Sequence, residues 1–168
     1  KDEIIFFDDN FVEDEDWIVE FCDSLIQKQL AFKWYCNGRV DTITEKMIEK
    51  MAQAGCDTIM YGIESGSQEL LNYIEKGISI EQVKAAIKTT KKFNIKTWGY
   101  FILGLPKETP ESGKKTIQFA IDLGLDFAQF TLPKVFPGTK LYDLCKQEGT
   151  LLDNLDDFYN TFVYDSAL

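Results

Sequence analysis

Short apolar runs alternate along the chain with stretches in which apolar residues recur every three or four positions. The runs are typical of buried strands, and the spacing of three or four is typical of amphipathic helices. We therefore expect strands at about 3–7, 32–36, 57–63, 95–103 and 125–132, and helices at about 17–26, 45–54, 68–74, 79–93, 110–123 and 139–149.

The order of these elements predicts an α/β fold. Strand starts near positions 3, 32, 57, 95 and 125 are 29, 25, 38 and 30 residues apart. That is the length of a βαβ unit, and such units build right-handed parallel sheets. Five units are too few for a closed eight-fold barrel of about 250 residues, which leaves a doubly wound sheet or a partial barrel. No linker rich in Pro, Gly or Ser divides the chain, so we expect one domain over residues 1–168.

The charge of the chain excludes one broad class of function. The 168 residues include 28 acidic and 18 basic side chains, a formal net charge of -10. General nucleic-acid binding is not expected, because that affinity depends largely on Lys and Arg. No apolar run approaches the roughly 20 residues needed to cross a bilayer, and no signal peptide is visible. We expect no membrane span and a cytoplasmic location.

Cysteine and histidine usage excludes most metal chemistry within the chain. The four cysteines, Cys22, Cys36, Cys56 and Cys145, are 14, 20 and 89 residues apart. Those spacings match no usual zinc or iron–sulfur pattern, so we expect reduced, buried thiols and no metal ligands. Histidine, the commonest general base, does not occur.

A polar or glycine-rich segment follows every predicted strand. Ligands of parallel α/β folds bind at the carboxyl ends of the strands, so we expect a pocket there. Glu64 is the most informative residue, because a carboxylate directly after a buried strand needs partners. The other segments have plainer alternatives, namely a helix cap at 8–10, a surface ion pair between Arg39 and Asp41, a turn at 104–106 and a cap at 138–139.

Several common enzyme classes are disfavoured by what these segments contain. The glycines at 62–66 do not form the dinucleotide-binding pattern, and no P-loop is present. A serine nucleophile would find no histidine to activate it.

Taken together and in order, the strand-end motifs resemble the radical S-adenosylmethionine superfamily. The similarity is greatest to the branch whose members often carry a cobalamin-binding domain, and it covers about residues 3 to 145. The motifs are Asp8-Asp9-Asn10-Phe11, Arg39-Val40-Asp41, Ala54-Gly55-Cys56, Gly62-Ile63-Glu64-Ser65-Gly66, Lys76-Gly77-Ile78, Gly104-Leu105-Pro106-Lys107-Glu108-Thr109 and Phe136-Pro137-Gly138-Thr139.

The resemblance implies a partial, TIM-barrel-like (β/α) barrel of six units, of which this chain supplies about five, strands two to six. In that family a cysteine triplet after the first strand holds a four-iron four-sulfur cluster. Reductive cleavage of S-adenosylmethionine then yields a 5′-deoxyadenosyl radical, which leads to hydrogen abstraction or methyl transfer. Cobalamin, held by a separate domain, is a further cofactor of this branch.

The resemblance also implies cofactor-binding roles for individual residues. Asp9 and Asn10 lie where the family's second-strand motif approaches the methionine amino group. Glu64 and Ser65 lie where polar residues of the family's fourth strand contact the methionine or ribose portion. Lys76 is placed to pair with the methionine carboxylate. The implied set also includes Arg39. Ile102, Gly104 and Pro106 would lie beside adenine, and Gly138 would lie on the far wall of the pocket, near the substrate.

The chain departs from the family pattern in one large respect. None of its cysteines has the spacing of the cluster-binding triplet. We therefore expect a piece of a longer enzyme that lacks the N-terminal strand and cluster loop, and is inactive alone. The longer protein would act on a small-molecule substrate with an electron donor, and the exposed sheet edge could pair with a second copy. The alternative is a degenerate barrel that binds a ligand or partner without a cluster.

Overall fold

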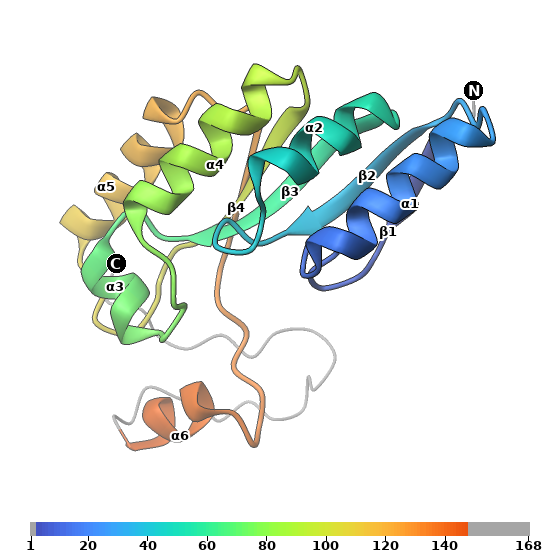
Figure 1. Cartoon of the computed structure of the whole chain (residues 1–168). Coiled ribbons are helices and arrows are strands. Elements are labelled where there is room, and N and C mark those ends of the chain that lie inside the picture. Colours follow the sequence, from blue (N-terminus) through green and yellow to red (C-terminus); the bar gives the residue numbers. More distant parts are fainter. Residues whose placement is uncertain (1–2, 148–168) are drawn as a thin grey trace.

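A computed structural model describes residues 3–147. The aromatic segment 152–168, which we expect from its sequence to pack on the body of the molecule, lies outside the described residues. Strands and helices alternate from one end of the described residues to the other, as the apolar pattern predicts (Figure 1). The strands are β1 (Glu3–Phe6), β2 (Lys33–Gly38), β3 (Cys56–Glu64), β4 (Lys96–Ile102) and β5 (Phe127–Thr131), and the helices are α1 (Glu15–Gln27), α2 (Glu45–Gln53), α3 (Gln68–Tyr73), α4 (Ile80–Lys92), α5 (Pro110–Asp122) and α6 (Lys140–Gln147).

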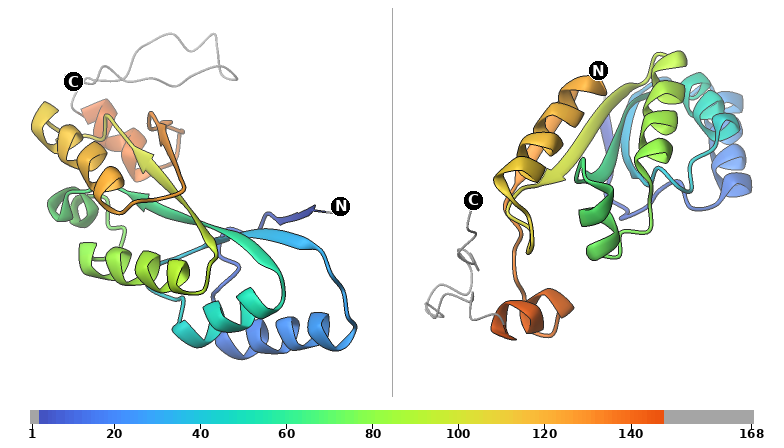
Figure 2. Two further views of the ribbon diagram at one scale, coloured as in Figure 1. Left: turned by 90° about the horizontal axis from the view of Figure 1, so that it is seen from above. Right: turned by 90° about the vertical axis from the view of Figure 1, so that its left-hand side faces the viewer.

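The five strands form one parallel sheet in the order β1-β2-β3-β4-β5. The sheet curves, and α1, α2, α4 and α5 lie along its outer side (Figure 2). A doubly wound sheet would reverse its strand order and carry helices on both faces. The strand order and the one-sided helices together make this a partial (β/α) barrel, and the doubly wound alternative is excluded.

Local sequence fixes where the helices begin. Asp14, Thr44, Ser67, Ser79 and Thr109 stand at the N-caps of α1 to α5, and each side chain accepts a hydrogen bond from a backbone N–H of the first turn. Such caps satisfy N–H groups that have no partner inside the helix. The capped ends of α1, α2, α3 and α5 follow the loops that leave the carboxyl ends of β1 to β4, which holds those loops in place.

The main hydrophobic core lies between the sheet and the outer helices. Alternate residues of β2, Trp34, Cys36 and Gly38, are buried against the helices, and the indole N–H of Trp34 donates to the carbonyl of Ala54 at 2.9 Å. Phe101 and Phe119 belong to the same core. The four cysteines are buried, as the sequence predicts.

The opposite face of the sheet forms the concave inside of the partial barrel. Its side chains line a cavity of about 870 Å³, and they include Tyr35, Asn37, Met60, Trp98 and Tyr100. The outermost strand at one edge, β1, leaves Ile4 and Ile5 exposed. None of the described helices combines the length and apolar character that crossing a membrane requires.

Candidate ligand site at the carboxyl ends of the strands

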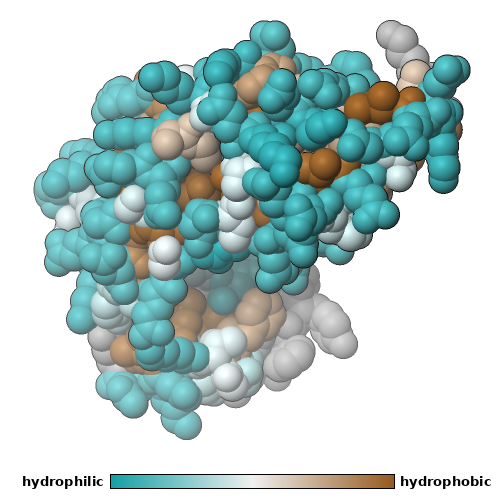
Figure 3. Space-filling model, in the orientation of Figure 1, coloured by the Kyte–Doolittle hydropathy of each residue, from teal (hydrophilic) through white to brown (hydrophobic). Residues whose placement is uncertain are grey.

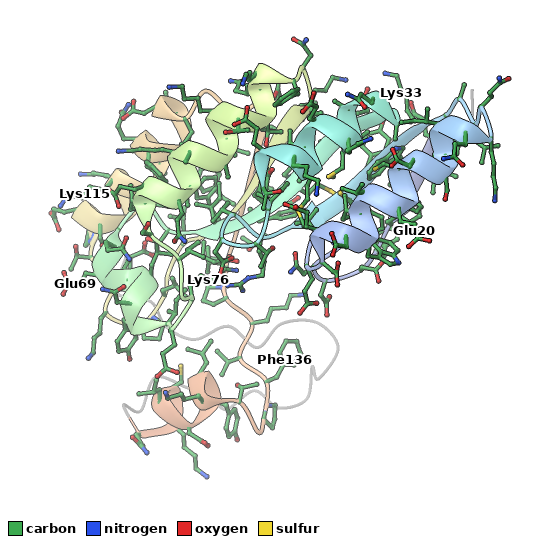
Figure 4. All side chains as sticks on the ribbon, viewed as in Figure 1. Glu20, Lys33, Glu69, Lys76, Lys115 and Phe136 are labelled. Carbon is green, nitrogen blue, oxygen red and sulfur yellow. The ribbon has the colours of Figure 1, made fainter. Side chains whose placement is uncertain are left out.

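The two ends of the sheet carry different sets of charged residues. Figure 4 labels Lys33, which lies near the amino ends of the strands, and Lys76, which lies at the opposite end among the loops. The residues that the sequence singled out, apart from Gly138, all lie at or just beyond the carboxyl ends. This edge, with Asn10, Arg39, Glu64 and Lys76, is called the rim below.

Glu64 is the last residue of β3 and the centre of the rim. Its backbone is in the left-handed region (φ 68°), and the pairing of β3 with β4 shifts register between Gly62 and Glu64. A left-handed conformation is uncommon for a residue other than glycine, and such strained positions cluster at functional sites. The Glu64 carboxylate accepts a hydrogen bond from Lys76 Nζ at 2.6 Å, and the two side chains are only 16% and 21% exposed.

The backbone of Lys76 is held on both sides. Its N–H donates to the carbonyl of Leu71 at 3.0 Å, which closes the end of α3. Its carbonyl accepts a hydrogen bond from Arg39 Nη2 at 3.3 Å. The Arg39 guanidinium is in turn bidentate on Asp41, with distances of 2.9 and 2.8 Å, and these bonds lower the pKa of the Asp41 carboxyl. Arg39 and Asp41 thus form an ion pair that also ties two loops of the rim together.

Asn10 joins the first loop to the same network. Its Oδ1 accepts from the backbone N–H of Arg39 at 3.2 Å, and its Nδ2 donates to Thr42 Oγ1 at 3.4 Å. Asp9 beside it is exposed and has no hydrogen-bond partner among residues 3–147. Asn10 therefore positions the loop, while the Asp9 carboxylate is available to a ligand.

Ser65 points away from the rim. It is fully buried, its hydroxyl lies 3.1 Å from Thr116 Oγ1 on α5, and it accepts a bond from the Ser67 N–H. These contacts fasten the loop after β3 to α5. A role for Ser65 in binding a ligand directly stays a prediction.

The turn after β4 is held by a residue outside the predicted set. Glu108 Oε2 accepts hydrogen bonds from the backbone N–H groups of Gly104 and Leu105, the latter at 3.2 Å. Its Oε1 is buried and has no partner among the described residues. Burial raises the pKa of Glu108 in spite of the two backbone bonds. Glu108 therefore fixes the path of the backbone between Gly104 and Pro106.

Ile102 and Pro106 come together in an apolar cavity of about 290 Å³. Tyr73, at the end of α3, lines it as well, and the ammonium of Lys107 lies 4.4 Å from the centre of the Tyr73 ring. The space-filling view shows a hollow with apolar residues between the main body and the α6 segment (Figure 3). A cavity of this kind suits the flat, weakly polar face of an adenine ring.

Gly138 does not lie with the other predicted residues. It occupies an exposed turn before α6 with φ 84°, a conformation that favours glycine. The cavity beside Ile102 is lined by Lys140 and Leu141 from the same segment, and Gly138 is not part of its lining. Its predicted place near substrate remains a prediction.

The cysteines of this chain do not fit an iron–sulfur cluster. Cluster ligands are thiolates, and burial raises the pKa of the Cys22 thiol to about 12. Burial also raises the pKa of the Cys56 thiol. None of the four thiols stands on the rim, and residues 3–147 contain no group of three or more side chains of the kinds that hold a metal ion. The rim carboxylates, in contrast, fit the hydroxyl and ammonium groups of S-adenosylmethionine.

Sequence reasoning missed the roles of two contributors to the site, Glu108 and Gly62. Glu108, four residues after Gly104, accepts the backbone hydrogen bonds of the turn. The ion pair between Arg39 and Asp41, in contrast, is one of the alternatives that the sequence offered, and the structure shows it as a bidentate contact. Gly62 leaves the space that the Glu64–Lys76 pair fills, since a Cβ there would lie 2.8 Å from Glu64 Oε1 and 3.0 Å from Lys76 Nζ. No feature of the sequence identifies that last contact.

Comparison with known proteins gives a consistent result. Residues 2–120 match the family model of the radical SAM superfamily. An uncharacterized methyltransferase of Pyrococcus horikoshii is 39% identical over 150 residues, which are 89% of this chain and 33% of the relative. An anaerobic magnesium-protoporphyrin IX monomethyl ester cyclase of Rubrivivax gelatinosus is 34% identical over 126 residues, 74% of this chain and 23% of the relative.

Solved structures show the same fold. The radical S-adenosylmethionine methyltransferase TsrM from Kitasatospora setae, with cobalamin and a [4Fe-4S] cluster bound, superimposes with a TM-score of 0.77 at 19% identity, over 88% of this chain and 29% of that one. The cobalamin-dependent S-adenosylmethionine radical enzyme OxsB gives a TM-score of 0.62 at 26% identity, over 70% and 19% of the two chains. The chain spans about a third of the length of the Pyrococcus relative, and less of OxsB.

Proposed function

Since the chain belongs to the radical SAM superfamily, whose cofactors are S-adenosylmethionine and a four-iron four-sulfur cluster, we propose that it forms the S-adenosylmethionine-binding rim of such an enzyme. The observation that carries the proposal is the Glu64 carboxylate, mostly buried and strained at the carboxyl end of β3, where ligands of barrel folds bind. The same edge of the sheet carries the other polar groups that such a ligand needs.

Each part of S-adenosylmethionine has a counterpart on the rim. Glu64 accepts hydrogen bonds from the ribose hydroxyls, because an ionised carboxylate is an acceptor only. Asp9, exposed and without a partner among the described residues, accepts the methionine ammonium. Adenine packs against Ile102 and Pro106, in the cavity that Tyr73 also lines.

The cluster ligands come, in this proposal, from outside these 168 residues, because the four cysteines do not fit that role. When bound, the cluster supplies the electron that cleaves S-adenosylmethionine to a 5′-deoxyadenosyl radical, which leads to hydrogen abstraction or methyl transfer. Relatives described as methyltransferases support methyl transfer, and the cobalamin in TsrM and OxsB supports a cobalamin domain in the whole protein. The partners of that protein are a small-molecule substrate and an electron donor.

The exposed edge of β1 supports a further part of the proposal. Ile4 and Ile5 are exposed there, and an outermost strand offers unpaired backbone groups to another strand. The 168 residues alone are therefore expected to self-associate through this edge. A cytoplasmic location is expected for the whole protein.

Binding of S-adenosylhomocysteine tests the proposal on the chain itself. Calorimetric titration of the 168-residue chain is expected to show one site, and amide chemical shifts are expected to change around Glu64 and Gly104. Saturation at one site with shifts confined to these loops supports the rim as the binding site. No heat and no shift at millimolar ligand would contradict it.

A second candidate function is a binding module that holds a ligand without a cluster, which the buried cysteines favour. Iron and sulfide analysis of the whole protein, reconstituted without oxygen, separates the two. Four irons per chain with dithionite-dependent formation of 5′-deoxyadenosine supports the enzyme. A whole protein that binds S-adenosylhomocysteine and takes up no iron would establish the module instead.

A further inference from the structure

The outer layer of helices leaves one strand of the sheet without a cover. The helices α1, α2, α4 and α5 lie along the outer side of the sheet (Figure 2). The only described helix after β5 is α6, which packs with Val135 in a small hydrophobic cluster separate from the main core. All five residues of β5 are exposed, whereas buried residues alternate with more exposed ones along β2 and β4.

Phe130 shows which side of β5 lacks the cover. Its ring stacks on that of Phe101, with the ring centres 5.1 Å apart, and Phe101 is fully buried in the core between the sheet and the helices. Phe130 therefore faces the helix side of the sheet, yet it is 38% exposed. Leu132, directly after the strand, is 58% exposed.

One flank of α5 borders the same strand. Ile117 and Ile121 lie one turn apart on this flank and are 42% and 65% exposed. Asp122 lies on the other flank, where it lines a small cavity with lysines of α4. Because β5 is the outermost strand beyond β4, the flank that faces away from α4 faces β5. The surface formed by Ile117, Ile121, Phe130 and Leu132 is called the β5 corner below.

The sequence after α6 has the pattern that such a surface requires. Apolar residues recur every three or four positions between 151 and 162, which predicts an amphipathic helix. These residues are Leu151, Leu152, Leu155, Phe158, Tyr159 and Phe162. The positions between them include Asp153, Asp156 and Asp157, and residues 148–168 contain no Lys or Arg.

We propose that residues 151–162 cover the β5 corner with their apolar side and complete the outer layer of helices. Large apolar side chains gain free energy when another apolar surface removes them from water. The acidic residues of the segment suit Lys114, which stands one turn before Ile117 on the same flank of α5. Lys114 is exposed and has no ion pair among the described residues. No ligand enters this inference, so it stands independently of the proposed function.

The connection along the chain favours this segment over a second copy of the protein. Residues 148–150 join the segment to α6, so it meets the β5 corner of its own chain at a high effective concentration. A second copy would have to supply the same apolar surface from solution. The segment also follows β5 in the chain, as the other outer helices follow β1 to β4.

A double-mutant cycle in the 168-residue chain tests the contact. Ile and Asn have similar helix propensities, so Ile121→Asn at an uncovered position leaves the melting temperature nearly unchanged. If the segment covers the corner, Ile121→Asn and Phe158→Asn each lower the melting temperature by roughly 5 °C. The double variant then loses little more than one of them, because a displaced segment no longer covers Ile121.

Ile26→Asn is the matched control, since Ile26 on α1 is 41% exposed and lies away from the β5 corner. Its effect is expected to add to that of Phe158→Asn without coupling. If Ile121→Asn leaves the melting temperature unchanged, or if its effect adds fully to that of Phe158→Asn, the proposal is overturned.

Photochemical cross-linking gives a second measurement that does not depend on a loss of stability. With p-benzoylphenylalanine in place of Phe158, irradiation is expected to join position 158 to peptides of α5 or β5 within one chain. Cross-links between two chains would assign the β5 corner to a second copy. Cross-links to Trp98 or Tyr100 would place the segment inside the barrel, and either result overturns the proposal.

Discussion

The two ends of the sheet carry similar ion pairs in different surroundings. At the amino end Asp57 lies between Lys33 and Lys96, at 2.5 and 3.1 Å, and both lysines are about half exposed. At the carboxyl end Glu64 has one lysine, and both partners are mostly buried. Asp57 itself is only 11% exposed, so the two ends differ in the exposure of their lysines. Ion pairs with solvent-exposed partners contribute about 0–1 kcal/mol to stability, so each lysine of the amino end is replaceable.

The backbone around the two carboxylates differs even more. A register shift lies beside each of them, against β2 at Asp57 and against β4 before Glu64, but of the two only Glu64 is left-handed and has a glycine shaped to its partner. A pair that served only stability would not need strained backbone, which costs of order 1–3 kcal/mol. The contrast indicates that the amino end holds the sheet together and the carboxyl end is arranged for a ligand. This placement of the ligand site agrees with that in barrel enzymes, whose active sites lie at the carboxyl ends of the strands.

The largest effect is expected at Glu108, whose loss leaves two backbone N–H groups of the rim without their acceptor. Glu108→Ala should lower the free energy of unfolding by about 2–3 kcal/mol, because unsatisfied buried donors cost about 1–3 kcal/mol. Urea denaturation measures this directly. Glu108→Gln keeps an acceptor oxygen and serves as the matched control, and equal losses in the two variants would contradict the bonding role.

The next largest effect is expected on ligand affinity, and it distinguishes Glu64 at the carboxyl end from Asp57 at the amino end. Glu64→Gln should weaken S-adenosylhomocysteine by roughly tenfold, because a hydrogen bond to a charged acceptor becomes one to a neutral amide. Asp57→Asn at the amino end should leave the affinity unchanged. Isothermal titration of both variants makes the comparison, and similar losses would show that the two ends do not differ in function.

The pH dependence of stability should have opposite signs at the two ends. Burial raises the pKa of Glu108 above its ordinary value of 4.5, so its contribution to stability is complete below pH 4.5 and falls as the pH rises through the raised pKa. Burial opposes ionisation of Asp57 too, but bonds from Lys33 and Lys96 outweigh it and lower its pKa below 3.8. Its contribution is present above pH 3.8 and is lost as the pH falls through the lowered pKa.

Other carboxylates titrate in the same pH range. The two expected signs are therefore tested by the difference between the wild type and each variant in the free energy of unfolding as a function of pH. The free energy of unfolding is measured by urea between pH 3 and 7 for the wild type, Glu108→Gln and Asp57→Asn. The first variant should remove a decline above pH 4.5, and the second should remove part of the loss below pH 3.8. A decline above pH 4.5 that persists in Glu108→Gln would mean that another group causes it.

The strands could be predicted from sequence because each is a run of apolar residues between polar loops. The prediction for β2 ended at Cys36, two residues before the strand does, because Asn37 faces the half-exposed inside of the barrel. The choice between a doubly wound sheet and a barrel could not be made from the strand spacing, since it depends on which side the helices pack. The family resemblance supplied that choice, and the strand order and the helix side confirm it.

The location of the site at the strand ends could be predicted from the sequence, but most of its side-chain contacts could not. The position of Glu64 after a buried strand indicated that it needs a partner, but the partner lies 12 residues away across a helix. The hydroxyl of Ser65 turns to Thr116, 51 residues away, for which the local sequence gives no signal. Such contacts depend on how the loops pack on α5 and α3, and that packing follows from the whole fold.

The smallest effect is expected for the lysines of the amino end. Lys33→Gln and Lys96→Gln should each change the free energy of unfolding by less than about 1 kcal/mol, because half-exposed ion pairs are screened by solvent. Asp57 keeps one lysine in each variant, so the double variant should cost more than the sum of the two. A urea denaturation cycle over the four proteins measures that coupling. Strict additivity would show that Asp57 does not need either lysine, and the contrast with the single, buried partner of Glu64 would then become sharper.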